Sequence, residues 1–256
     1  MNDTLRQITI VLATIAVLTV NALANILPIN GQGSGEISDR IPVFFTPAGY
    51  VFSIWSLIYV GLIAYAIFQA LPMNQQDPTL RAIAPYYLVA SGANFAWIFA
   101  WHYERFPITV VLMLILLGSL IMTYLSLDGA RDSASTAMKW TVLIPFSIYL
   151  GWITVATIAN ISAMLWLVNW NGFGIAPEIW TAIVLAVAVG IAAMMALTRG
   201  DVAYGLVLVW AFFGIYSKHS EVPIVGMSAI IATILVAIMV VLSLFPSGGI
   251  LPLSRS

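Results

Sequence analysis

The chain has 256 residues, of which 62% are hydrophobic and only 7% are charged. Soluble domains carry about 25% charged residues, so this composition indicates an integral membrane protein. Nine Lys and Arg residues nearly balance ten Asp and Glu residues, which leaves no basic surface for binding nucleic acid. The chain has no cysteine, so disulfides, thiolate metal sites and cysteine nucleophiles are excluded.

The first apolar run covers about residues 7–28. It resembles a secretory signal peptide, because Arg6 precedes it and Ala22-Leu23-Ala24 has the form of a cleavage site. Its apolar part, however, is long enough to cross a bilayer. We therefore expect a first membrane helix that is retained.

Further apolar runs follow, each near the roughly 20 residues that a helix needs to cross the hydrocarbon core. The run 202–217 is short, so a chain with seven spans is the alternative. The pattern predicts an all-α, polytopic membrane bundle with eight spans. The runs after the first cover 49–72, 82–102, 106–127, 139–168, 178–198, 202–217 and 223–245.

The charges in the loops predict the orientation of this bundle. With eight spans, both termini lie on the side that carries six Lys and Arg residues, against three on the other side. The positive-inside rule then places both termini in the cytoplasm, and we expect a bacterial inner membrane. The six residues are Arg6, Arg81, Arg131, Lys139, Arg199 and Arg255.

Aromatic residues repeat at helical spacing inside three of the expected spans. Residues at i, i+3 and i+7 share one face of a helix, so each of these spans presents an aromatic face. Flat aromatic walls with a few amide groups suit a planar, largely apolar ligand. The residues are Phe52, Trp55 and Tyr59 on the second span, Asn94, Trp97 and Trp101 on the third, and Tyr149, Trp152, Ala156 and Asn160 on the fifth.

Several asparagines fall inside the spans, where an amide needs a hydrogen-bond partner. We expect Asn94 and Asn160 to point into the bundle, together with Asn21 and Asn25 of the first span. Two interpretations stay open for them, namely bonds between helices and contact with a ligand. No ionisable residue lies clearly at the middle of a span, which argues against a proton relay or an ion-coupled transporter.

Signals for catalysis are lacking. The sequence has no G-x-S-x-G motif, no H-E-x-x-H motif and no close pair of carboxylates within a span. His102 and His219 lie near span ends beside charged neighbours, so we expect them to be solvated and not to bind a metal. We therefore predict no enzyme, no metal site and no obligatory cofactor, with light-dependent chemistry on a bound pigment as the alternative.

Three motifs occur in order on the second, third and fifth spans. They are PAGYVFSIWSLIY at 47–59, NFAW at 94–97 and WITVATIAN at 152–160. They resemble motifs of the TspO family of tryptophan-rich sensory proteins, which includes the mitochondrial translocator or peripheral benzodiazepine receptor proteins. The resemblance covers about residues 7–170.

The resemblance implies a five-helix bundle over residues 1–170, with a pocket that the loop after the first helix closes. Porphyrins or other tetrapyrroles, and similar hydrophobic aromatic molecules, are the ligands it implies. The family's paired prolines become Pro47-Ala48 here, and no Lys or Arg lies near the end of the fifth span, so sterol binding is not expected. The lining residues that it implies are Trp55, Tyr59, Asn94, Trp97, Tyr149, Trp152 and Ala156; Phe52 and Asn160 complete our predicted site.

Residues 171–256 then form a C-terminal extension of about three spans. It contains an aromatic segment, 210–216, that can pack against the bundle, replace a homodimer contact or meet another membrane subunit. Two functions stay open for the chain. The first is binding of a tetrapyrrole for its sensing, transport or turnover, with membrane lipids and the hydrophobic ligand as partners. The second is an accessory role in a larger energy-converting or photosynthetic membrane complex.

Overall fold

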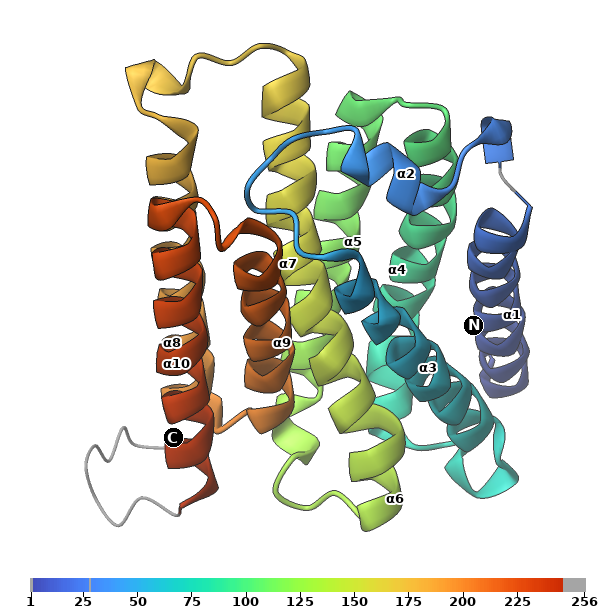
Figure 1. Ribbon diagram of the computed structural model, residues 1–256. Helices are drawn as coiled ribbons and strands as arrows, with labels where there is room; N and C mark the ends of the chain where they lie inside the picture. Colours follow the sequence, from blue (N-terminus) through green and yellow to red (C-terminus); the bar gives the residue numbers. More distant parts are fainter. Residues whose placement is uncertain (1, 28, 246–256) are drawn as a thin grey trace.

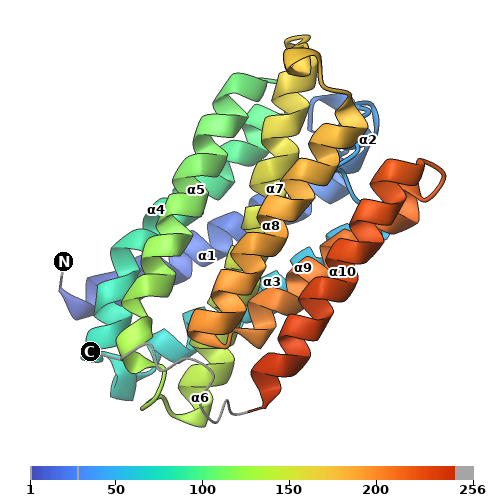
Figure 2. The same ribbon diagram turned by 90° about the vertical axis from the view of Figure 1, so that its left-hand side faces the viewer.

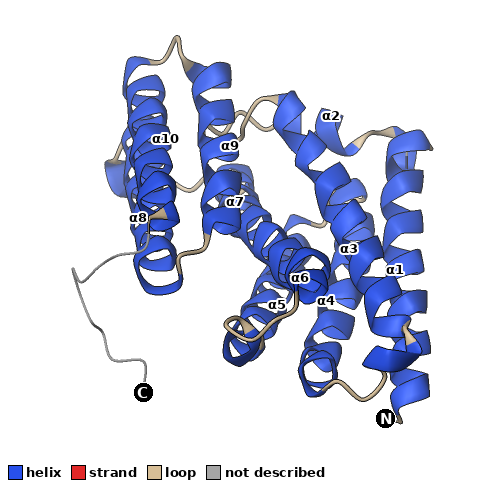
Figure 3. Ribbon diagram, turned by 90° about the horizontal axis from the view of Figure 1, so that it is seen from below, coloured by secondary structure: helices blue, strands red, loops and turns tan. Residues whose placement is uncertain are grey.

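The computed structural model describes residues 2–27 and 29–245, without the side chain of Asn25. This part of the chain is all-helical and contains no strand (Figure 3). Eight of its helical segments are long and apolar enough to cross a membrane. The predicted polytopic helical bundle is confirmed, and the short seventh run forms a helix of 18 residues that belongs to these eight.

The long helices are α1 (Asp3–Ile26), α3 (Ile54–Ala70), α4 (Pro78–His102), α5 (Phe106–Ser126), α7 (Ile144–Leu167), α8 (Pro177–Arg199), α9 (Val202–His219) and α10 (Pro223–Leu244). The shorter elements are α2 (Ser34–Asp39) and α6 (Thr136–Met138), the 3₁₀ turns η1 (Ile29–Gly31), η2 (Gly49–Ser53), η3 (Pro72–Asn74), η4 (Asp128–Ala130) and η6 (Gly172–Gly174), and the π-helical turn η5 (Lys139–Leu143).

Helix α7 lies at the centre of the bundle (Figure 1). It contacts α3 and α5 on one side and α9 on the other, and α9 in turn contacts α8 and α10. Helices α4 and α5 lie side by side (Figure 2), and α1 contacts both α3 and α4. The main hydrophobic core extends from Ile10 on α1 to Val240 on α10, so it crosses the predicted boundary at residue 170 without a break.

Capping signals in the sequence explain where several helices begin and end. Asp77 caps α4 by accepting a bond of 2.9 Å from the amide three residues on, and Pro78 follows it where no N–H is needed. Asp201 caps α9 in the same way through the amide of Tyr204. Gly200 ends α8 with a φ of 60°, the left-handed conformation that glycine adopts at low cost.

A buried carboxylate fixes the start of α9 against the central helices. Asp201 is 7% exposed and accepts hydrogen bonds from the hydroxyls of Tyr124 and Ser147. The guanidinium of Arg131 lies 3.5 Å from the same carboxylate and 4.2 Å from the centre of the Tyr124 ring. A buried charge is tolerated only with such partners, so this network ties α9 to α5 and α7.

Helix α9 also approaches α7 closely at Gly151. A Cβ atom placed there would lie 3.1 Å from Val207 Cβ and 3.3 Å from the carbonyl oxygen of Tyr204. Small residues at such contacts let membrane helices pack backbone to backbone. The aromatic segment 210–216 therefore belongs to a helix that packs against the bundle, the first of the three roles considered for it.

Candidate functional site

A cluster of aromatic rings lies where η2 and α3 meet α7. The Trp55 ring stacks on Tyr59 with centroids 5.5 Å apart, and Tyr149 approaches Trp55 at 6.0 Å. The Trp152 ring stands nearly perpendicular to Trp55 at 6.2 Å and to Phe52 at 5.6 Å. Each such pair contributes about 0.5–1.5 kcal/mol beyond its burial. We call Phe52, Trp55, Tyr59, Tyr149 and Trp152 the aromatic cluster.

The backbone around Phe52 differs from the expected α-helix. Residues Gly49–Ser53 form a 3₁₀ turn, and the α-helix begins only at Ile54. A 3₁₀ turn has about three residues per turn, so side chains three residues apart, such as Phe52 and Trp55, lie on the same side. Both rings accordingly pack against Trp152, which is buried, while Phe52 itself is 36% exposed. Phe52 and Trp55 therefore face the same neighbour, and only the predicted α-helical backbone at Phe52 is corrected, to a 3₁₀ turn.

Asn94 joins three helices behind the cluster. Its side-chain oxygen accepts a bond of 2.8 Å from Asn21 Nδ2 on α1, and its Nδ2 donates to the Tyr149 hydroxyl on α7 at 3.2 Å. Asn94 is 2% exposed. These contacts agree with the interpretation that Asn94 bonds helices together, while Asn25 has no described side chain with which to test the same expectation.

The other predicted site residues lie outside the aromatic cluster. Trp97 stacks on Trp101 at 5.2 Å, in a smaller core beneath α2. Asn160 donates from Nδ2 to Thr109 on α5 at 3.0 Å. Ala156 is partly buried and packs against the main core. The structure thus separates Trp97 and Asn160 from the rings of the aromatic cluster, while Ala156 lies one turn after Trp152 on α7.

Three polar atoms of the predicted site residues are buried without a hydrogen-bond partner. They are Nε1 of Trp97, Nε1 of Trp152 and Oδ1 of Asn160. Leaving a buried polar group unsatisfied costs about 1–3 kcal/mol, so such atoms are candidates for contact with a ligand. Of these atoms, only Trp152 Nε1 belongs to the aromatic cluster, so it is the donor available to a ligand there.

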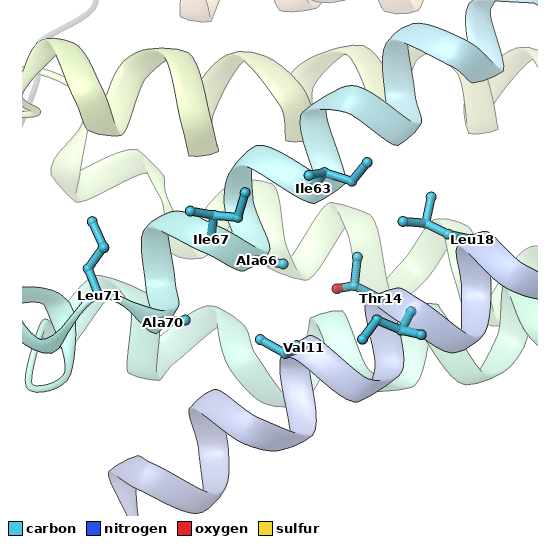
Figure 4. A pocket seen from close by; sticks show the side chains of 9 residues that line it. Val11, Thr14, Leu18, Ile63, Ala66, Ile67, Ala70 and Leu71 are labelled. Carbon is cyan, nitrogen blue, oxygen red and sulfur yellow. The ribbon is translucent and has the colours of Figure 1, made fainter.

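A groove of about 400 Å³ opens between α1 and α3 (Figure 4). Its walls are aliphatic apart from Thr14, whose hydroxyl lies 2.6 Å from the Tyr87 hydroxyl. Ile63 lies four residues after Tyr59, so the groove shares a face of α3 with the aromatic cluster. Its size falls within the roughly 300–1,000 Å³ typical of small-molecule sites. The lining residues are Val11, Thr14, Ile15, Leu18, Ile63, Ala66, Ile67, Ala70 and Leu71.

Sequence reasoning did not find this groove. It depends on how far α1 and α3 separate, and no motif encodes that distance. The small side chains of Ala66 and Ala70, one turn apart on α3, are the signal that could have indicated room beside this helix.

The segment 29–53, which we call the connecting segment, links α1 to α3 and contains α2 and η2. Figure 1 shows it passing from the end of α1 across the bundle to α9 before α3 begins. At the end of α4, Trp101 Nε1 donates to the carbonyl oxygen of Ser34, and the Ser34 hydroxyl lies 3.1 Å from His102 Nε2. His102 is fully buried, so the expectation that it is solvated is wrong, because α2 covers the end of α4.

An ion pair on the surface adds to this attachment. Arg40 Nη2 lies 2.7 Å from Glu104 Oε1, which also accepts a bond from Gln32. The hydrogen bond from Arg40, followed by that from Gln32, lowers the pKa of Glu104 below its usual value. Among residues 2–27 and 29–245, no group of three or more His, Asp or Glu side chains is placed to hold a metal ion.

One family model, described as TSPO-like protein, matches residues 7–242. The match includes α8, α9 and most of α10, so it extends beyond the residues 7–170 that carry the resemblance in the sequence. The comparisons with curated proteins and with solved structures gave no match. Because the family match spans nearly the whole chain and all eight membrane helices, this integral membrane protein belongs to the TSPO-like family.

Proposed function

We propose that this membrane protein binds a porphyrin or another tetrapyrrole, or a similar hydrophobic aromatic molecule, against the aromatic cluster. The observation that carries the proposal is the assembly of Phe52, Trp55 and Trp152, whose rings meet edge to face while Trp152 Nε1 stays buried without a partner. A flat π-system can pack against such rings, and a polar group at its edge can accept the indole N–H. The protein would serve in the sensing, transport or turnover of this ligand.

The groove between α1 and α3 supports a route to this site from the bilayer. A hydrophobic ligand dissolves in the hydrocarbon core of the membrane. The groove is lined by aliphatic side chains and lies on the face of α3 that also carries Tyr59, so such a ligand can contact it from the bilayer. In this proposal the ligand enters between α1 and α3 and reaches the aromatic cluster along this face of α3.

We further propose that both termini face the cytoplasm of a bacterial inner membrane. Eight spans place the start of α1 and the end of α10 on one side. Arg6, Arg81, Arg131, Lys139 and Arg199 belong to this side, and the excess of positive charge favours the cytoplasm. The sixth cationic residue counted in the sequence, Arg255, lies outside the described residues.

Titration of the purified protein with protoporphyrin IX, followed by the absorbance of the porphyrin, tests the proposed function. The double variant Trp55→Leu, Trp152→Leu should bind about 5- to 150-fold more weakly, since two aromatic contacts of about 0.5–1.5 kcal/mol each are lost. Trp166→Leu is the matched control, because Trp166 lies on the same helix and is 46% exposed. Equal affinities in a folded double variant and the wild type would contradict the proposal.

A further inference from the structure

Helix α9 holds the connecting segment just before α3 begins. The amide of Ala48 donates to the carbonyl oxygen of Gly214 at 3.1 Å. The indole Nε1 of Trp210 donates to the carbonyl oxygen of Val51 at 3.0 Å. The first bond involves the backbone of Ala48, the residue before η2, and the second involves the backbone of Val51 within η2. Together they hold the backbone of this part of the connecting segment in place.

The contact at Gly214 is too close for any other residue. A Cβ atom there would lie 2.1 Å from Val51 Cγ2 and 3.2 Å from Pro47 Cβ. Val51 is fully buried, so it has no free space into which to withdraw. The backbone of α9 therefore packs directly against the first residues of η2.

Further contacts extend this attachment from the middle of α9 to its C-terminal end. The Tyr50 ring meets the Trp210 ring edge to face at 5.2 Å. Near the end of α9, Lys218 Nζ lies 3.0 Å from a carboxylate oxygen of Asp39, which is the last residue of α2. The connecting segment is thus attached to α4 on one side and to α9 on the other.

Helix α9 also contacts the other wall of the aromatic cluster. Gly151, where α9 approaches α7 closely, directly precedes Trp152 in the chain. Phe52, whose ring packs against Trp152, directly follows Val51. Through Val51 and Gly151, α9 therefore contacts both backbones that carry this pair of rings.

We infer that α9 positions the aromatic cluster by fixing η2 against α7, so that Trp210 and Gly214 determine how long a ligand stays bound. The consequence for the ligand rests on the proposed function. The consequence for η2 does not, because the contacts between η2 and α9 involve protein atoms alone.

Two variants and one control test this inference. Gly214→Ala introduces the Cβ that η2 cannot accommodate, and Trp210→Phe keeps a ring against Tyr50 while removing the donor to Val51. Gly190→Ala is the control, because a Cβ at Gly190 on α8 would meet nothing within 4 Å. If Gly214→Ala fails to fold, Trp210→Phe still provides the test.

Hydrogen–deuterium exchange of the ligand-free protein and the dissociation rate of protoporphyrin IX are the measurements. Both variants should exchange the amides of residues 48–55 at least about fivefold faster than the wild type, the change expected for one lost hydrogen bond. They should also release protoporphyrin IX at least about fivefold faster, whereas Gly190→Ala should match the wild type in both.

Unchanged exchange in both variants would overturn the inference, and so would faster exchange with an unchanged dissociation rate. If the wild type does not bind protoporphyrin IX, the proposed function is wrong and exchange alone decides the inference. Faster exchange that extends to residues 52–55 then supports a positioning role, and faster exchange confined to residue 48 overturns it.

Discussion

Replacing Asn94 with leucine distinguishes the two interpretations of the buried amides. Leucine has a similar volume, so the main loss is the pair of hydrogen bonds to Asn21 and Tyr149. Hydrogen bonds between membrane helices contribute about 0.6 kcal/mol each, so the free energy of unfolding should fall by about 1.2 kcal/mol. Asn21 keeps its bond to the carbonyl oxygen of Val17 in this variant, which limits the cost of the substitution.

Reversible unfolding in mixed detergent micelles measures this change. A double-mutant cycle with Tyr149→Phe should give a coupling energy of about 0.6 kcal/mol for the one bond that the two side chains share. Phe95→Leu is the control, because Phe95 lies next to Asn94 on α4 and is 40% exposed. Unchanged stability together with a large loss of porphyrin affinity would refute the reasoning and show that Asn94 contacts the ligand.

Three further predictions concern the network at α9, the groove and the connecting segment. Asp201→Ala should lower the free energy of unfolding by about 3 kcal/mol, because it leaves the buried hydroxyls of Tyr124 and Ser147 without their acceptor and removes one of the two carboxylates beside Arg131; the same unfolding assay measures it. Ala70→Phe fills part of the groove and should slow association of protoporphyrin IX in stopped-flow experiments, with little change in dissociation. The pKa of Glu104 is lower in the folded protein than in the unfolded chain. Its ion pair with Arg40 therefore stabilises the folded protein at every pH above the pKa of an ordinary carboxyl group. This stabilisation is lost as the pH falls through the pKa that Glu104 has in the folded protein. The protection of the α2 amides, measured as the ratio of the intrinsic to the observed exchange rate at each pH, should therefore fall below about pH 4 in the wild type, and Glu104→Gln should show the lower protection already at neutral pH.

The sequence was sufficient to predict the spans and much of the aromatic cluster, because both follow from local spacing. A run of about 20 apolar residues has few alternatives to a membrane helix. Spacing of four residues placed Trp55 beside Tyr59 on α3, and spacing of three residues placed Tyr149 and Trp152 on one face of α7. That these faces meet each other was expected from their matched spacing and from the resemblance to TspO proteins, not from the pattern of any single helix.

The features that were missed depend on contacts between segments that are distant in the sequence. His102 has charged neighbours in the chain, yet it is buried because α2 folds over the end of α4. The 3₁₀ turn at Phe52 accompanies the close contact of Val51 with Gly214, which is more than 150 residues away in the chain. Neither contact leaves a periodic pattern that a single sequence can show.

Photochemical crosslinking identifies the bound position of the ligand most directly. A diazirine derivative of protoporphyrin IX, bound to the wild-type protein, illuminated and mapped by mass spectrometry, should label peptides that contain residues 52–59 and 149–156. An excess of unmodified protoporphyrin IX should prevent this labelling. Labelling that is confined to Val11, Leu18 and Ile67 in the groove, or that the competitor does not reduce, would contradict a ligand site at the aromatic cluster.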